Sequence, residues 1–380
     1  MYYCIANPSA RSGNRSDSLE KLLTILRKQG IPCRLYYSQG PAHARHLAEI
    51  ISSLPRTAED PVNLIVAGGD GTFNEVLNGI RNYENLRLGL LPAGSGNDLA
   101  RGLGLPDDPD VIIRMIAEGK VRRHIDLGAL RYHAISDVRT PGQSITKSAS
   151  RKASKPSSRK AEKNSFRKAA KPSSRKAAES MTAPKASHAA SSMDCCSSAD
   201  QIAAGGLEHR FAISSGIGFD AAVCEEALSS NIKDFFNKFH LGKLSYGTIA
   251  LRQILTAKKT ACDITMDGGR SLHLDHLLFC AVMNCAFEGG GYRFAPDADP
   301  GDGEMTLIAV GDISRPKAIL SFPAAHAGKY YDIKEVHHFR VRSAEIRTEN
   351  PLWVHTDGEV FCKSRHISVT CLPGKAALIV

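Results

Sequence analysis

The first hundred residues alternate between short apolar segments and longer segments with helical spacing, and this alternation limits the fold more than any other feature. The apolar segments predict strands at residues 2–6, 34–37, 62–67 and 86–91. The intervening segments predict helices at residues 16–29 and 42–54, near residue 73, and from about residue 97. Buried strands that alternate with amphipathic helices are typical of an α/β domain with a parallel sheet.

The pattern changes after Asp126. Short strand-like segments then dominate, at residues 127–132, 210–214, 261–266, 277–283, 305–310, 339–347, 352–356 and 367–371. Helical spacing remains near residues 220–229, 246–255 and 314–322. Many short strands with few helices predict a mostly antiparallel β-sandwich or open barrel. We therefore expect an α/β domain at residues 1–126 and a β-rich domain at residues 127–380.

A basic segment interrupts the second domain at about residues 136–205. The sequence Lys-Pro-Ser-Ser-Arg-Lys-Ala of residues 155–161 recurs at residues 171–177, and residues 134–200 hold 14 Lys and Arg against 5 Asp and Glu. This composition buries too little apolar surface to offset the entropy of ordering, so we expect a disordered insertion in a hairpin loop. The rest of the chain is nearly neutral, which is not the profile of a dedicated nucleic-acid-binding fold.

Three turns of glycine and polar residues follow predicted strands. Their sequences are Asn-Pro-Ser-Ala-Arg-Ser-Gly at residues 7–13, Gly-Gly-Asp-Gly-Thr at residues 68–72 and Gly-Ser-Gly-Asn-Asp at residues 94–98. Glycine lets the backbone approach a phosphate closely, and the N-terminus of a following helix favours negative charge. Ligands of open α/β sheets bind at the carboxyl ends of the strands, so the three turns together predict a nucleotide site. Asp70 adds a carboxylate that can hold Mg²⁺ directly or through water.

These turns resemble those of the catalytic domain of diacylglycerol and sphingosine kinases, and most of all those of the bacterial soluble lipid kinases. The resemblance covers nearly the whole chain outside the insertion. Further matching motifs lie at residues 125–128, 216–223, 242–246, 295–298, 302–303 and 357–359. Their order and spacing make the match specific. The resemblance implies an ATP-binding α/β domain, a lipid-binding β-sandwich domain and an active site between them.

The resemblance also implies roles for individual residues. The residues expected to contact ATP are Asn7, Ser38, Gly68, Gly69, Asp70, Gly71, Thr72, Phe73, Asn74, Gly94, Ser95, Gly96 and Asn97. Glu359 matches the family's general base, which takes the proton of the lipid hydroxyl. Asp70 is expected to organise Mg²⁺ and the phosphates, and it is the rival candidate for the base. Asp126 is expected to support this network.

A second metal site is implied in the acidic segment of residues 297–304. Asp302 matches a family position for a structural metal, with the backbone carbonyls of Asp299 and Glu304 as partners. Oxygen ligands of this kind suit a hard cation. The alternative is a solvated acidic turn without a metal.

The expected activity is ATP-dependent transfer of the γ-phosphate to a lipid hydroxyl, with diacylglycerol as the first choice and phosphatidic acid as the product. Three alternatives stay open: an NAD kinase-like activity, a sphingoid-base kinase, and a membrane- or nucleic-acid-binding role of the basic insertion. No segment approaches the roughly 20 apolar residues that span a bilayer, and the first residues lack the pattern of a signal peptide. We expect a cytoplasmic protein, bound peripherally to the inner face of the membrane where its lipid substrate lies. Nucleic acid is not an expected partner, and a homodimer is left open.

Overall fold

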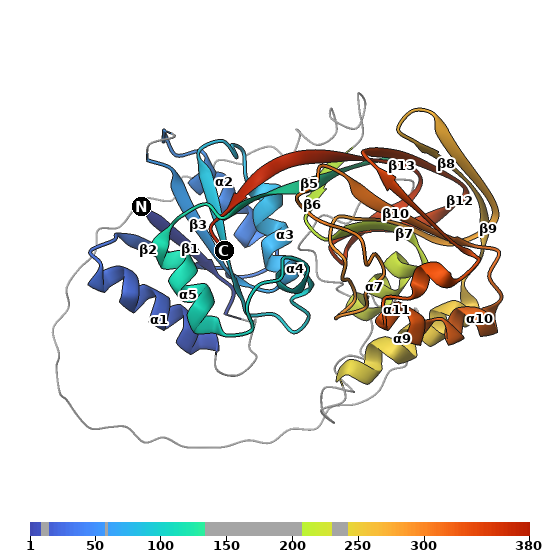
Figure 1. The fold of residues 1–380 in the computed structure, drawn as a ribbon, viewed down its shortest axis with the longest axis horizontal. Coiled ribbons are helices and arrows are strands. Elements are labelled where there is room, and N and C mark those ends of the chain that lie inside the picture. The colour runs from blue at the N-terminus through green and yellow to red at the C-terminus, as the bar shows by residue number, and fades with distance from the viewer. Residues whose placement is uncertain (9–14, 58–59, 134–206, 230–241) are drawn as a thin grey trace, which may run out of the picture.

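The computed structural model describes residues 1–8, 15–57, 60–133, 207–229 and 242–380, without the side chains of residues 15–16, 229 and 242–247. Figure 1 shows an α/β domain beside a β-rich domain. The predicted disordered insertion at residues 136–205 lies outside the described residues. Most of the first predicted turn, at residues 9–13, lies outside them as well.

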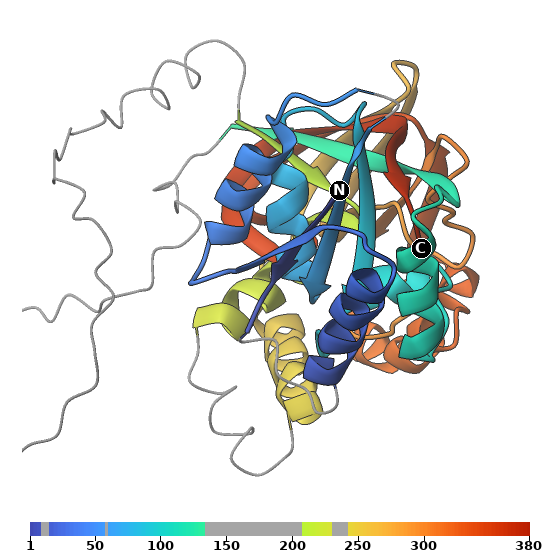
Figure 2. The same cartoon turned by 90° about the vertical axis from the view of Figure 1, so that its left-hand side faces the viewer.

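The α/β domain contains a sheet of four parallel strands in the order β4–β3–β1–β2. The strands are β1 (Tyr2–Ala6), β2 (Cys33–Tyr37), β3 (Val62–Gly68) and β4 (Leu86–Pro92). The helices are α1 (Arg15–Lys28), α2 (His43–Ser52), α3 (Asp70–Gly79), α4 (Asp98–Gly102) and α5 (Pro109–Glu118). Helix α1 packs beside α5 and α2 beside α3, and Figure 2 shows the two pairs on opposite faces of the sheet. With both faces covered, every residue of β1 and β3 is buried.

Helix α5 lies outside the predicted elements, although its ends carry clear signals. The side chain of Asp108 caps its N-terminus by accepting a hydrogen bond from the backbone N–H of Asp110, and Pro109 is the first helical residue. Gly119 ends the helix with a φ of 65°. A capping acid, proline in the first turn and a left-handed glycine after the last turn mark a helix.

The second domain is built from strands that pair with one another in antiparallel fashion. They are β5 (Arg123–Tyr132), β6 (Leu207–Phe211), β7 (Ser214–Gly218), β8 (Thr260–Met266), β9 (Arg270–Met283), β10 (Met305–Gly311), β11 (Val336–Val341), β12 (Ser343–Thr356) and β13 (Glu359–Leu378). One apolar core lies between the strands. A second core lies under α7 (Phe219–Ser229), α9 (Gly242–Thr256), α10 (Arg315–Leu320), α11 (Phe322–His326) and the short η1 (Tyr330–Asp332).

One expected feature of this domain has a different form in the structure, and another is as expected. The single strand predicted at residues 339–347 is divided between β11 and β12 at Arg342, where the backbone N–H groups of Arg342 and Ser343 donate to the Asp267 carboxylate. Strands β5 and β6 pair with Tyr132 opposite Leu207. The segment that joins them therefore connects the two strands of a hairpin, as expected for the insertion.

The last strand connects the two domains. Ala377 and Leu378 of β13 pair in parallel with Arg87 and Leu88 of β4, so the strands form one 13-stranded sheet. Figure 1 shows β13 running from the β-rich domain into the α/β domain. Residues 378–380 are buried in the core of the α/β domain. The C-terminal tail thus packs into the first domain, which the predicted division into residues 1–126 and 127–380 did not include.

Candidate active site

The two complete glycine-rich turns lie against each other at the carboxyl ends of β3 and β4. The backbone N–H of Ala93 donates to the carbonyl of Gly68 at 2.8 Å. A Cβ placed on Gly69 would lie 2.9 Å from the Cα of Gly94, and a Cβ on Gly94 would lie 2.6 Å from the Cα of Gly69. Since no side chain fits at either position, only glycine lets the turns meet. The convergence predicted for these two turns is therefore present.

Asp70 joins the two turns through its carboxylate. This side chain at the start of α3 accepts hydrogen bonds from the backbone N–H groups of Asp98 at 3.0 Å and Leu99 at 3.2 Å. Burial raises the pKa of Asp70 to about 6, aided by the charge of Asp98 and opposed by the two N–H donors. The two carboxylates converge, because a methyl group on Gly96 would lie 3.4 Å from Asp70 Oδ2 and 3.7 Å from Asp98 Oδ2.

The carboxylate of Asp70 fits the way in which proteins hold Mg²⁺. Protein sites for Mg²⁺ in phosphoryl-transfer enzymes commonly supply one or two carboxylates and leave the other positions to water and substrate phosphates. Asp70 provides a carboxylate beside a backbone that is free of side chains at Gly69 and Gly94, whereas the Asp98 carboxylate already pairs with Arg101 and accepts the Gly290 N–H. The donors present are therefore suited to a complex of Mg²⁺ with a nucleotide.

Polar side chains hold the turns in shape. The Asn97 side-chain oxygen accepts a hydrogen bond from the backbone N–H of Gly94 at 2.9 Å. The Asn7 amide donates to the Thr72 hydroxyl at 3.0 Å, which brings the first and second turns together. Ser38 directly follows β2 and is buried, whereas Ser95 is exposed on the other turn. Apart from Phe73 and Asn74, the predicted ATP contacts thus cluster at one edge of the sheet, and their roles stay predictions.

Two residues expected to contact ATP have other side-chain partners. The ring of Phe73 is buried in the core of the α/β domain, so the prediction that it contacts ATP holds at most for its backbone. The Asn74 amide donates to the Asp357 carboxylate at 2.9 Å and to the Arg210 carbonyl at 3.2 Å. Its side chain therefore connects the two domains.

Asp357 and Glu359 reach the turns from the second domain, and their carboxylates have different surroundings. The Asp357 carboxylate accepts hydrogen bonds from the backbone N–H groups of Ala212, Ile213 and Ser214 at 3.0, 2.8 and 3.0 Å. Burial raises the pKa of Asp357, while these donors and Asn74 act in the opposite direction. Glu359 is exposed, and its Oε1 lies 2.9 Å from the position that a Cβ on Gly71 would occupy. Asp357 thus fixes the turn, and Glu359 presents a carboxylate to the glycine-rich turn.

A further loop of the site was not among the predicted residues. The backbone N–H of Gly290 donates to Asp98 Oδ2 at 2.7 Å, and the Ser214 hydroxyl donates to Glu288 Oε1 at 2.6 Å. Residues 289–291 are three consecutive glycines, and all have positive φ angles. A run of glycines indicates backbone conformations that other residues rarely adopt. This run is the sequence signal that could have identified the loop.

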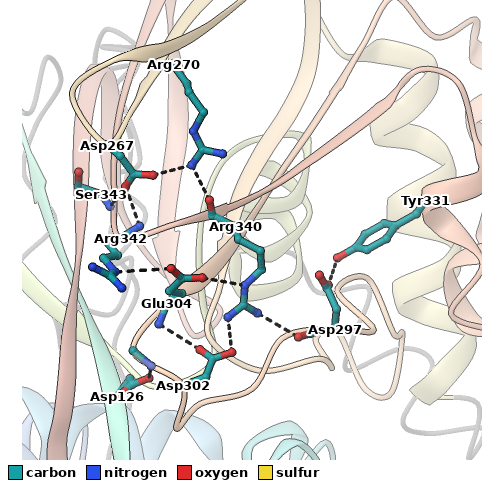
Figure 3. A network of polar contacts seen from close by, with 11 residues as sticks. Asp126, Asp267, Arg270, Asp297, Asp302, Glu304, Tyr331, Arg340, Arg342 and Ser343 are labelled. Carbon is teal, nitrogen blue, oxygen red and sulfur yellow. Dashed lines mark hydrogen bonds and ion pairs between the residues drawn. The ribbon is translucent and has the colours of Figure 1, made fainter.

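The acidic loop at residues 297–304 is neutralised by arginine (Figure 3). The Arg340 guanidinium pairs with the Asp302 carboxylate, lies 3.4 Å from Glu304 Oε2 and donates to the Asp297 carbonyl at 3.0 Å. Arg342 lies 3.5 Å from Glu304 Oε1. In the described part of the chain, no group of three His, Cys, Asp or Glu side chains is placed to hold a metal ion.

A structural metal would therefore share the Asp302 carboxylate with Arg340, and the predicted metal site stays a prediction. The positive charge beside Asp302 and Glu304 already comes from the protein, and Asp299 Oδ1 accepts a hydrogen bond from the backbone N–H of Gly301 at 3.0 Å. Asp126 was expected to support the phosphate site. In the structure it contacts this acidic loop instead. Its carboxylate accepts hydrogen bonds from Gly303 at 2.7 Å and Gly374 at 2.6 Å.

Two family models match the chain. The diacylglycerol kinase catalytic domain matches residues 1–130, and the YegS C-terminal NAD kinase beta sandwich-like domain matches residues 214–380. The "Putative lipid kinase YtlR" of Bacillus subtilis (strain 168) is 24% identical over 94% of this chain and 93% of the relative. A diacylglycerol kinase of Staphylococcus carnosus (strain TM300) is 35% identical over 33% of this chain and 40% of its own length.

The fold is also found among solved structures. The crystal structure of a diacylglycerol kinase from Bacillus anthracis str. Sterne has a TM-score of 0.57 and 17% identity, and the match covers 100% of this chain and 96% of that chain. The likeness confirms the fold, and the second family model confirms the predicted β-sandwich. The two family models together define a two-domain protein of the kinase class, with a diacylglycerol kinase catalytic domain and a C-terminal β-sandwich. The chain belongs to the diacylglycerol kinase-like family of lipid kinases.

Proposed function

We propose that this protein transfers the γ-phosphate of ATP to the hydroxyl of diacylglycerol and so forms phosphatidic acid. The observation that carries the proposal is the position of Glu359, which the second domain places against Gly71 in the phosphate region of the first domain. A kinase for a lipid alcohol needs such a base beside the phosphates. The family, and the relatives that are named diacylglycerol kinase, support diacylglycerol as the acceptor.

The first domain binds and orients the nucleotide. Phosphoryl transfer depends mainly on positioning and on neutralising the charge of the phosphates. The two glycine-rich turns would offer backbone N–H groups to the phosphate oxygens, and Asn7 and Asn97 hold these turns in place. Asp70 would hold Mg²⁺, which when bound neutralises charge on the phosphates.

Glu359 acts on the acceptor. Its carboxylate takes the proton of the lipid hydroxyl as the hydroxyl oxygen bonds to the γ-phosphorus, and the bond from that phosphorus to the β–γ bridging oxygen breaks to release ADP. Asp70 is less suited to this step because both of its oxygens accept backbone hydrogen bonds from α4. We therefore assign the base to Glu359 and the organisation of Mg²⁺ to Asp70.

We propose that the enzyme works in the cytoplasm as a peripheral protein at the inner face of the membrane, because its substrate lies there. Within the described ranges, no helix is both long and apolar enough to cross a bilayer. The basic insertion at residues 136–205 would add attraction to anionic headgroups, at about 1 kcal/mol for each Lys or Arg near the surface. Deletion of residues 146–185 should weaken binding to anionic vesicles at low salt and spare turnover on detergent-solubilised lipid. Unchanged vesicle binding would exclude this role.

The test of the proposed reaction offers the full chain γ-labelled ATP and one acceptor at a time. The acceptors are diacylglycerol, sphingosine and NAD. We expect labelled phosphatidic acid, and no labelled product from the Asp70→Asn variant. Labelled NAD without labelled lipid would replace the proposal with an NAD kinase, and labelled sphingosine alone would replace it with a sphingoid-base kinase.

A further inference from the structure

A buried histidine lies directly behind the turn that carries Glu359. His355, near the end of β12, has no solvent exposure. Its Nδ1 accepts a hydrogen bond at 3.2 Å from the backbone N–H of Gly358, the residue immediately before Glu359. On the other side of the ring, Nε2 lies 3.1 Å from Asp220 Oδ2 and 3.5 Å from Glu288 Oε1. The imidazole thus joins the Glu359 turn to two carboxylates from different parts of the second domain.

These partners determine the protonation of the ring. The N–H of Gly358 can only donate, so Nδ1 must be an unprotonated acceptor, and Nε2 carries the hydrogen that points to the carboxylates. Burial acts against a charged ring and lowers the pKa of His355, whereas the Asp220 and Glu288 carboxylates raise it. A second ring proton on Nδ1 would face the N–H of Gly358. This contact opposes the charged ring, and the carboxylate of Asp220 holds the proton of the neutral ring on Nε2.

The space around the imidazole is reserved for these contacts. A Cβ placed on Gly216 would overlap the Asp220 carboxylate and would lie 2.5 Å from His355 Nε2. The adjoining strand β7 therefore needs glycine at this position for the ring and the carboxylate to meet. His355 is held in one orientation by packing on this side and by hydrogen bonds on the others.

The same cluster reaches the phosphate region of the first domain. Glu288 is followed by the glycine loop, and the backbone N–H of Gly290 donates to the Asp98 carboxylate at 2.7 Å. The backbone N–H of Asp98 in turn donates to Asp70 at 3.0 Å. A continuous set of contacts therefore runs from the carboxylates near the phosphates, through the glycine loop and His355, to the turn before Glu359.

The turn itself needs such support. Asp357 has a φ of 49° and Gly358 a φ of 83°, so two successive residues have left-handed backbone conformations. A residue other than glycine is held in this conformation at a cost in free energy, and it stays there only where the surroundings fix it. The Asp357 carboxylate is held by Asn74 and by backbone N–H groups of residues 212–214, and the Gly358 N–H is held by His355.

We propose that His355 is a positioning residue for phosphoryl transfer. By accepting the Gly358 hydrogen bond at Nδ1, it fixes the direction in which the Glu359 carboxylate points toward Gly71. Asp220 and Glu288 fix the ring and its tautomer, and the glycine loop ties this arrangement to Asp98. The inference rests on the proposed role of Glu359 as the base.

Two variants separate the two nitrogens of the ring. His355→Asn places an acceptor oxygen near the Nδ1 position and leaves Nε2 unreplaced, whereas His355→Gln places an amide nitrogen near Nε2 and no acceptor near Gly358. We expect His355→Gln to lose about 100-fold in kcat, since a base displaced by about 1 Å costs that much. His355→Asn should keep kcat within about tenfold of the wild type because it retains the Gly358 contact. The KM for MgATP should change less than about twofold in both, since the phosphate turns are untouched.

The wild-type rate in the same assay tests the proposed function, and the ratio of the two variants tests His355. Equal losses in kcat, or a rise in KM for MgATP with kcat unchanged, would overturn the proposal. Nitrogen-15 NMR of the histidine-labelled wild type gives a readout that depends on neither variant folding. We expect one buried histidine with a protonated Nε2 and an unprotonated Nδ1 at pH 7. Protonation of Nδ1 in every buried histidine would also overturn the proposal.

Discussion

Asp357 and Glu359 lie two residues apart in one motif, and removing them should affect the protein in different ways. In Asp357→Ala, the backbone N–H groups of residues 212–214 and the Asn74 amide lose their acceptor. A buried donor without a partner costs about 1 kcal/mol or more, which gives about 4 kcal/mol for four donors. The loss of the buried carboxylate, whose pKa is raised by burial, offsets part of this cost. We therefore expect the free energy of unfolding to fall by about 3 kcal/mol.

Urea unfolding followed by the fluorescence of Trp353, the only tryptophan of the chain, measures this change. Glu359→Gln is the matched control, because Glu359 is exposed and its replacement should change the free energy of unfolding by less than about 1 kcal/mol. A loss below about 1 kcal/mol in Asp357→Ala, or equal losses in the two variants, would refute the division of roles between the two carboxylates.

Three further predictions concern other parts of the site. Gly94→Ala should weaken MgATP binding at least about tenfold in titration calorimetry, because its methyl group would force the two turns apart. Gly40→Ala is the control and should have no effect, because Gly40 has open space around it. Equal affinities of the two variants would contradict this prediction. Burial raises the pKa of Glu288 from 4.5 to about 7, so the folded state binds this proton more tightly than the unfolded chain does, and stability is lost as the pH rises through that range. Glu288→Gln removes this titration, and its free energy of unfolding relative to the wild type should rise by about 3 kcal/mol between pH 5 and pH 8; a constant difference would contradict the assignment. Arg340→Met should lower the free energy of unfolding by about 1–2 kcal/mol, and Ca²⁺ should then raise the Tm of this variant but not that of the wild type or Arg342→Met. If Ca²⁺ raised the Tm of the wild type but not that of Asp302→Asn, the acidic loop would be a metal site as first predicted.

The α/β domain was predictable because its signals are local. Apolar runs and helical spacing place β1, β3 and β4 within about one residue of their observed bounds. The C-terminal tail was not predictable in this way, because Leu378 pairs with Leu88, far away in the sequence, and nothing near either residue indicates the partner. Long-range pairing of this kind depends on the assembled sheet.

In the candidate site, too, local features were predictable from the sequence and long-range contacts were not. The glycine spacing identified both glycine-rich turns, but the contact of Gly69 with Gly94 exists only in three dimensions. The motif at residues 357–359 presents two carboxylates, and sequence alone does not show that one of them is held by backbone N–H groups. Arg340 lies on β11, away from the acidic loop along the chain, so the predicted metal site took no account of it.

The role that we propose for the second domain is to supply the base for a reaction on phosphates held by the first. Its most direct test is the rate of phosphatidic acid formation by Glu359→Gln, together with the affinity of the same variant for MgATP. Loss of a general base typically costs about 10²–10⁴-fold, so we expect kcat to fall by that amount while the affinity for MgATP stays within about twofold of the wild type. A variant that keeps kcat within about tenfold of the wild type would contradict the claim.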